Sequence, residues 1–332
     1  MQNSESTLSG LWDRYGFDRP RDLTPVSGSG TDNETWIVTR IGGERIVLRR
    51  YAPSFQEDQL RLEHRVLAHL KEVRFPCAPP LAAPTGETFV QLQGRYYALF
   101  EYCQGLLLRR PLWRWFLTDR IPVAGRTLAL YHRLMEGFHP AGLNLSPGFR
   151  YPDSVQLLAR CREILASKSE LSSFDRYVRD RLQVIEDRWI QVRKHLEGNE
   201  SLFSDVLMHN DFGPPNIFFK GRRIVAVLDF SNARFGKRIS DFAYALISFS
   251  KWRGPTLHGG LLRGFFEAYQ AEYPLRAEEL EFLFPWMMSN RLSNLCWLLV
   301  QHYQNGRSKA AGWFVDNFEL LLWLERYQGR WK

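Results

Sequence analysis

Eight residues at positions 209–216, HNDFGPPN, combine a carboxylate that can accept a proton with oxygen donors that can hold a cation. Asp211 and Asn216 follow a short apolar segment, Val206–Met208, which is typical of a strand. The Gly-Pro-Pro run between them cannot form regular helix, because proline lacks the amide hydrogen and restricts the residue before it. The sequence therefore predicts a stiff loop at the end of a strand, with Asp211 and Asn216 on it.

A second carboxylate, Asp229, directly follows the apolar segment Ile224–Leu228. The segment 216–230 has the pattern of a hairpin, and we expect its ends to bring Asp229 and Asn216 into one patch with Asp211. Two carboxylates and a carboxamide are oxygen ligands of the kind that hold Mg²⁺ together with waters and phosphates. They are a poor set for zinc, which prefers nitrogen and sulfur.

The spacing of these residues matches the protein-kinase signature, in which H-R-D-L-x-x-x-N is followed by D-F-G. Here the second motif is Asp-Phe-Ser at 229–231. In phosphoryl transfer the protein mainly positions groups and neutralises charge. The pattern predicts that Asp211 orients an acceptor hydroxyl and takes its proton, while Asn216 and Asp229 hold Mg²⁺. The alternative, that all three are ordinary turn residues, is disfavoured because both motifs occur together at strand ends.

Two further polar residues flank these motifs. His209 comes directly after the predicted strand, and we expect it to be a buried, hydrogen-bonded support of the loop rather than an acid or a base. Asp241 stands at the start of a predicted helix in ISDFA. We expect it to brace the catalytic loop rather than to bind the metal.

The chain resembles the aminoglycoside phosphotransferase and choline kinase superfamily, and the resemblance covers most of its length. It is carried by HNDFGPPNIFF (209–219) and VLDFSNARFGKRISDFA (227–243), with weaker support from LALYHRL (128–134). The resemblance implies an α+β, two-lobed protein-kinase-like fold, with ATP and Mg²⁺ as cofactors and a hydroxyl-bearing acceptor.

The distribution of patterns along the chain agrees with a small β-rich lobe at residues 1–104 and a larger, mainly helical lobe at 105–332. In the first lobe we expect strands at Thr35–Arg40 and Arg45–Arg50 joined by Gly42-Gly43, then a helix near 57–73 and a hairpin that turns at Gly94. In the second lobe, the only marked β interruption is expected from Val206 to Asp229.

The resemblance also suggests nucleotide-binding residues in the first lobe. A cation on the third strand would hold phosphates and pair with a carboxylate on the following helix, which suggests Arg49 and Glu63; strand alternation does not exclude Arg50. A turn that covers phosphates and a hinge that contacts adenine through its backbone are further expectations. These involve Gly28, Ser29 and Gly30 in the turn, and Glu101 and Cys103 in the hinge.

Two departures from protein kinases favour a small-molecule acceptor similar to an aminoglycoside, homoserine or choline. Asn210 replaces the arginine that reads a phosphorylated activation loop, and only about a dozen residues separate Asp229 from Asp241, with no A-P-E motif. A protein Ser/Thr kinase and an inactive nucleotide-binding module remain alternatives. The many tryptophans and a group of acidic residues could line a cationic acceptor's pocket. Tryptophans at helical spacing are more often core residues, and acidic residues on an amphipathic helix more often face solvent. The residues are Trp113, Trp115, Trp252, Trp286, Trp297, Trp313, Trp323, Glu267, Glu272, Glu278, Glu279 and Glu281.

Composition further narrows the expected partners and the expected cellular location of the protein. The net charge of +8 comes without a long Lys/Arg block, so no nucleic-acid partner is expected. Four scattered cysteines fit neither a zinc site nor a disulfide framework and suggest a reducing cytosol. No apolar run reaches the length of a membrane span, and the polar N-terminal residues contain no apolar signal core, so we expect a cytoplasmic protein without a membrane partner. The sequence gives no indication of an oligomeric state.

Overall fold

The computed structural model describes residues 2–26, 33–107, 119–140, 151–251 and 254–328. The chain divides into two compact units. Unit 1 comprises Met1–Arg109, His139–Leu145 and Pro215–Ala233, and unit 2 comprises Arg110–Phe138, Ser146–Pro214 and Arg234–Lys332. The hairpin after Pro215 thus belongs with the N-terminal residues in this division, and the expected lobe boundary at residue 104 stays a prediction. Among the described residues, no helix is long and apolar enough to cross a membrane.

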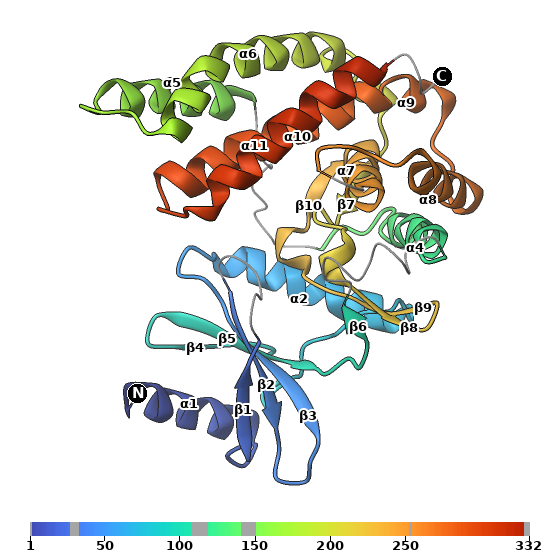
Figure 1. The fold of residues 1–332 in the computed structure, drawn as a ribbon. Coiled ribbons are helices and arrows are strands. Elements are labelled where there is room, and N and C mark those ends of the chain that lie inside the picture. The colour runs from blue at the N-terminus through green and yellow to red at the C-terminus, as the bar shows by residue number, and fades with distance from the viewer. Residues whose placement is uncertain (1, 27–32, 108–118, 141–150, 252–253, 329–332) are drawn as a thin grey trace. The chain divides into compact units, whose positions relative to one another are not determined.

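Unit 1 is built on an antiparallel sheet of five strands in the order β1-β2-β3-β5-β4 (Figure 1). The predicted hairpins are present, and Gly43 takes a φ of +84° at the first turn, a conformation that glycine adopts without strain. The strands are β1 (Asp22–Pro25), β2 (Glu34–Thr39), β3 (Arg45–Arg50), β4 (Val90–Leu92) and β5 (Arg95–Glu101).

Unit 1 also contains helix α1 before the first strand of this sheet and helix α2 after its third strand. Helix α1 (Gln2–Tyr15) buries Leu11, Trp12 and Tyr15 in one core with the apolar side chains of the sheet. Helix α2 (Glu57–Glu72) forms where apolar residues recur at helical spacing, and its start is stabilised by a capping box between Gln56 and Gln59.

A second sheet in unit 1 contains the hairpin that lies between Asn216 and Asp229 in the sequence. Strands β6 (Leu106–Leu107), β8 (Ile217–Lys220) and β9 (Arg223–Val227) are hydrogen-bonded in the order β6-β8-β9. The amide of Val227 donates to the Pro76 carbonyl at 2.9 Å, which ties the end of β9 to the segment after α2. The short helix η3 (Phe230–Asn232) follows and packs against α2.

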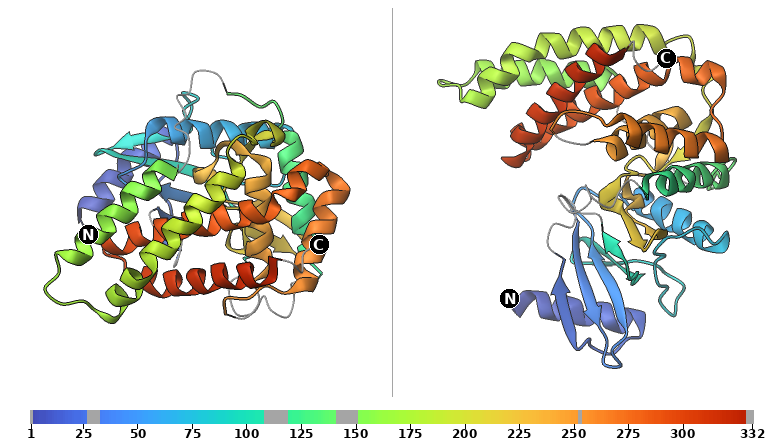
Figure 2. Two further views of the ribbon diagram at one scale, coloured as in Figure 1. Left: turned by 90° about the horizontal axis from the view of Figure 1, so that it is seen from above. Right: turned by 45° about the vertical axis from the view of Figure 1, so that its right-hand side comes forward.

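Unit 2 is mainly helical, as the sequence predicts. Figures 1 and 2 show α10 and α11 packed side by side, and α5 and α6 also pack together. Helix α6 starts at a capping box in which Ser172 accepts from the amide of Asp175. The helices are α4 (Ile121–Leu134), α5 (Tyr151–Ala166), α6 (Ser173–Leu196), α7 (Arg238–Ser250), α8 (Gly259–Glu272), α9 (Ala277–Glu281), α10 (Leu283–Tyr303) and α11 (Lys309–Tyr327).

One expectation about unit 2 is wrong. Strand β7 (Asp205–Met208) pairs with β10 (Arg234–Lys237), a strand that lies beyond the predicted end of β structure at Asp229. The segment of β10 is too short and polar to show strand alternation. A Cβ atom at Gly236 would lie 2.4 Å from the Met208 methyl, which is the flexible end of that side chain.

Candidate active site

Asp211 lies in unit 2, on the loop that follows β7, as the sequence predicts. The neighbouring His209 is fully buried, and its Nδ1 accepts from the Asp211 amide at 3.2 Å. Asn210 takes a φ of +63°, so the chain turns sharply between these two residues. The contacts of His209 fit the expected role of a loop support.

Asp241 supports this loop from the first turn of α7. Its Oδ2 accepts from the amide of His209 at 2.7 Å, and its Oδ1 accepts from the amide of Asn210 at 2.9 Å. Burial alone would raise the pKa of Asp241, but the hydrogen bonds that it accepts from the His132 side chain and from the His209 amide lower it overall. The carboxylate therefore stays charged and can hold both amides.

His132, which the sequence marks only as part of the LALYHRL motif, completes the support. Its Nε2 lies 3.0 Å from Oδ2 of Asp241, and its Nδ1 lies 2.7 Å from the Tyr269 hydroxyl. Burial lowers the pKa of His132, so a neutral ring can donate to the carboxylate and accept from the tyrosine. The motif flagged the residue, but its partner Asp241 is more than a hundred positions away in the chain.

Tyr244 is a contact of Asp211 that sequence reasoning missed. Its hydroxyl donates to Oδ1 of Asp211 at 2.6 Å. Burial raises the pKa of Tyr244, as does the charge of Asp211, so the hydroxyl keeps its proton and acts as a donor. The tyrosine follows Asp241 by three positions on α7, which places the two on one side of the helix.

The predicted phosphate-binding residues meet in unit 1. Nη1 of Arg49 lies 2.8 Å from Oε1 of Glu63 and 3.9 Å from Oδ1 of Asp229. Burial alone would lower the pKa of Arg49, but the charge of Glu63, with Tyr51 and Asp229, raises it overall. Arg50 forms an ion pair with Glu34 instead. Of the two candidate arginines, Arg49 is therefore the one beside Asp229.

A second buried network, which was not predictable from the sequence, contacts Glu63. The Tyr51 hydroxyl donates to Oε2 of Glu63 at 3.0 Å and lies 3.1 Å from Nε2 of His64. Nδ1 of His64 lies 2.7 Å from the Thr88 hydroxyl. This network orients the carboxylate that holds Arg49.

The proposed metal ligands also belong to unit 1. The amide of Leu228 donates to the Asn216 carbonyl at 2.8 Å, and the Ser231 hydroxyl donates to Oδ1 of Asp229 at 2.6 Å. Asp229 has a φ of +62°, and its side chain is 28% exposed, so the carboxylate is accessible. An amide and a carboxylate oxygen fit Mg²⁺, which takes one or two protein ligands along with water and phosphate. Among the described residues, no cluster of three or more His, Cys, Asp or Glu side chains could hold a metal by itself.

The remaining predicted nucleotide contacts, including those of the Glu101 and Cys103 backbone, stay predictions. Glu101 ends β5 and Cys103 follows it by two residues. Gly28, Ser29 and Gly30 lie outside the described residues, so the phosphate-covering turn stays a prediction. The same is true of Trp113, Trp115 and Trp252 as pocket residues.

Glu279, one of the acidic residues considered as a contact for a cationic acceptor, lies in the core instead. Glu279 is fully buried, accepts from the amide of Ser204 at 3.1 Å, and pairs with Arg238 at 2.7 Å. It is therefore neither a solvent-facing residue nor a free contact for a cation.

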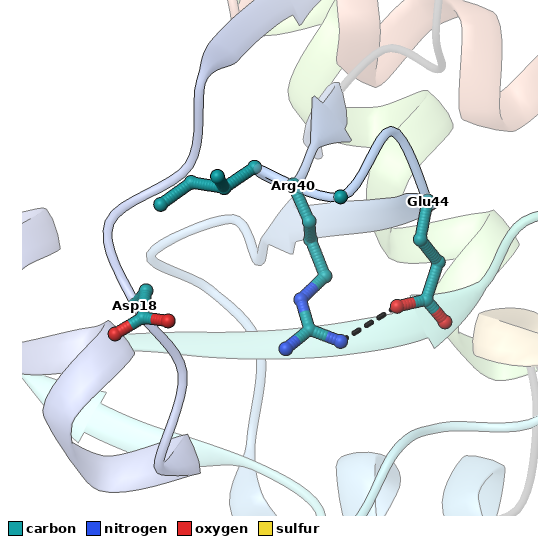
Figure 3. Close-up of a pocket in the computed structure, with 5 residues that line it drawn as sticks. Asp18, Arg40 and Glu44 are labelled. Atoms are coloured by element: carbon teal, nitrogen blue, oxygen red, sulfur yellow. Dashed lines mark hydrogen bonds and ion pairs between the residues drawn. The ribbon is translucent and has the colours of Figure 1, made fainter.

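A surface hollow of about 200 Å³ lies at the turn between β2 and β3, also in unit 1 (Figure 3). Arg40 and Glu44 point toward one another there and pair at 2.6 Å. The lining residues are Asp18, Arg40, Ile41, Gly42 and Glu44. None of the candidate site residues is among them.

The sequence comparisons agree with the geometry. Residues 22–278 match the model of the phosphotransferase enzyme family. A homoserine kinase of Sinorhizobium medicae is 28% identical over 269 residues, covering 79% of this chain and 74% of the relative. A homoserine kinase of Rhizobium meliloti is 29% identical, with the same coverage.

Solved structures share the fold at low identity. An amicoumacin kinase in complex with AMP-PNP and Ca²⁺ superposes with a TM-score of 0.72 at 13% identity, covering 96% of this chain and 92% of the other. A microcompartment-associated aminopropanol kinase gives a TM-score of 0.68 at 16% identity, with 98% of each chain covered. The expected kinase-like α+β fold is thereby confirmed. Since the family model spans well over half of its length, the chain belongs to the phosphotransferase enzyme family.

Proposed function

We propose that this phosphotransferase moves the γ-phosphoryl group of Mg-ATP to a hydroxyl group of a small molecule. The observation that carries the proposal is the cluster of Arg49, Glu63 and Asp229, in which a largely buried cation is held beside a carboxylate that remains accessible. A guanidinium in this position suits the phosphates of a nucleotide, because its fork of donors matches phosphate oxygens.

The chain supplies separate groups for the nucleotide and for the acceptor. Arg49 would bind phosphate oxygens, and Asn216 with Asp229 would hold Mg²⁺, which neutralises charge on the phosphates. Asp211, oriented by Tyr244, would accept the proton of the acceptor hydroxyl. The hydroxyl oxygen then forms the new bond to the γ-phosphorus, the bond from that phosphorus to the β-phosphate oxygen breaks, and ADP leaves.

A small acceptor is favoured over a protein. The kinases named among the relatives and structural neighbours act on homoserine, amicoumacin and aminopropanol. In this chain Asn210 stands where a regulated protein kinase has an arginine, and its amide is held by Asp241. The loop is therefore supported by a permanent carboxylate and not by a phosphorylated segment.

The test is ADP release from Mg-ATP with a panel of acceptors: L-homoserine, 3-aminopropan-1-ol, choline, ethanolamine, an aminoglycoside and casein. Asp211→Asn serves as the blank, and binding of Mg-ATP to both proteins is measured by calorimetry. We expect turnover with a small acceptor, loss of that turnover in Asp211→Asn, and binding of Mg-ATP to both. Turnover with casein alone, or equal turnover in Asp211→Asn, would contradict the proposal.

A further inference from the structure

Arg291, on α10, is a buried cation that the catalytic scheme does not use. The residue is 3% exposed, and its Nη1 donates to Oδ1 of Asn317 at 3.0 Å. Its Nε and Nη2 have no hydrogen-bond partner among the residues that the structure describes. Burial lowers the pKa of Arg291, as expected for a cation without a neutralising carboxylate.

The two unpartnered atoms are adjacent on the guanidinium. Nε and Nη2 form one side of the planar fork, and their N–H bonds run nearly parallel, so this side can bind both oxygens of one carboxylate. A buried charge with two unused donors is unfavourable unless a ligand satisfies it. An anion bound on this side of the guanidinium would satisfy both donors, while Asn317 holds Nη1.

Arg291 lies close to the proposed proton acceptor Asp211. Its guanidinium carbon lies 5.7 Å from the centre of the Tyr244 ring. The hydroxyl of that same tyrosine donates to Asp211, the proposed proton acceptor. All three residues belong to unit 2, and helices α7 and α10 pack against each other. Tyr244 is thus a common neighbour of Arg291 and of Asp211, the residue that would accept the hydroxyl proton.

We propose that Arg291 binds a carboxylate of the acceptor through Nε and Nη2, so that the substrate is a hydroxy acid or hydroxy amino acid. The inference rests on the proposed function, because it needs an acceptor beside Asp211. A buried arginine repels the cationic groups of aminoglycosides and choline, and it attracts a carboxylate. This distinguishes among the acceptor classes that the sequence leaves open.

A matched pair of acceptors isolates the carboxylate. L-homoserine and 3-aminopropan-1-ol share the hydroxyl, the chain and the amine, and only the first has the carboxylate. We expect the unmodified protein to prefer L-homoserine by at least about 100-fold in kcat/KM, since a site built for a polar group rejects an analogue that lacks it. In Arg291→Met this preference should fall to within a few-fold, mainly through a higher KM for L-homoserine.

Two further variants control the experiment. Arg291→Lys keeps the charge but not the fork, and we expect it to retain an intermediate preference and to remain folded if Arg291→Met does not. Arg181→Met removes another arginine of unit 2 whose Nε has no partner among the described residues and whose guanidinium carbon lies 3.5 Å from the ring centre of Tyr177. It should leave the preference unchanged. Thermal unfolding and calorimetric binding of Mg-ATP verify that each variant is intact.

The outcomes separate this inference from the proposed function. Equal kcat/KM for the two acceptors, or a preference that survives in both Arg291 variants, would overturn the role of Arg291 while the phosphotransferase activity stands. Absence of turnover with every acceptor of the larger panel would overturn both.

Discussion

Tyr244 donates a 2.6 Å hydrogen bond to Oδ1 of Asp211. Helix α7 therefore supports the proposed catalytic loop twice, because Asp241, one turn earlier, holds two of the loop's backbone amides. One contact sets the backbone and the other sets the carboxylate. A proton acceptor must be held close to its productive orientation, and this helix provides both restraints.

The first prediction concerns Tyr244. We expect Tyr244→Phe to lower kcat by roughly 10- to 100-fold, since a hydrogen bond to a charged group contributes about 1.5–3 kcal/mol. The KM for Mg-ATP should not change, because Tyr244 contacts the proposed base and not the nucleotide residues. Steady-state kinetics with the best acceptor of the panel measure both parameters. A fall in Mg-ATP affinity with normal kcat would contradict this role.

The second prediction compares two neighbouring arginines. Arg49→Met should raise the KM for Mg-ATP by about 10-fold or more, because it removes a desolvated cation beside Asp229 and leaves Glu63 buried without its partner. Arg50→Met removes the same charge from the next position, where it pairs with the more exposed Glu34. Its effect on KM should be less than about twofold, as expected for an exposed ion pair. Equal effects of the two substitutions would contradict the assignment.

The third prediction concerns the contact between α4 and α8. A side chain at Gly125 would place its Cβ 2.4 Å from the Phe265 carbonyl oxygen, so the two helices must move apart. We expect Gly125→Ala to lower the free energy of unfolding by about 2 kcal/mol or more. Gly312→Ala, on α11 with open space around it, is the matched control and should raise stability by about 0.5–1 kcal/mol. Urea unfolding measures both.

The fourth prediction is a pH dependence that arises from His64. Burial, with the charge of Arg49, lowers the pKa of His64 to about 3. In the unfolded chain the ring takes up a proton near its ordinary pKa of about 6.5, so acid favours unfolding. The stabilisation is fully present above that pH and is lost as the pH falls toward the folded value.

The measurement compares slopes and not absolute stabilities. Between about pH 6 and pH 4 the free energy of unfolding should fall by up to about 1.4 kcal/mol per pH unit more steeply in the unmodified protein than in His64→Gln. Urea unfolding at a series of pH values gives both slopes. Identical slopes would show that His64 is protonated in the folded protein.

The local sequence pattern was sufficient to predict several helices and strands. The hairpins around Gly43 and Gly94 and the helix at Glu57–Glu72 were predictable because their pairing or periodicity lies within a short stretch of chain. Strand β10 was not, because its four residues show no alternation and pair with Met208 and its neighbours across more than twenty residues.

For the candidate site, the sequence by itself determined the residue types and their spacing: Asp211 and Asn216 on one stiff loop and Asp229 after the following hairpin. These relations are local, since a strand, a turn and two prolines leave the backbone few alternatives. The choice between Arg49 and Arg50 needed the tertiary structure, because successive strand residues point to opposite faces and only packing decides which face meets Glu63.

Tertiary structure alone also brought His132, Tyr244 and Arg291 to the proposed base and its support. These residues come from three helices. The sequence marks His132 only through the LALYHRL motif, and Tyr244 and Arg291 are ordinary members of an amphipathic or apolar pattern. Their roles depend on burial and on partners far away in the chain. Sequence spacing carries no information about such contacts until the helices pack.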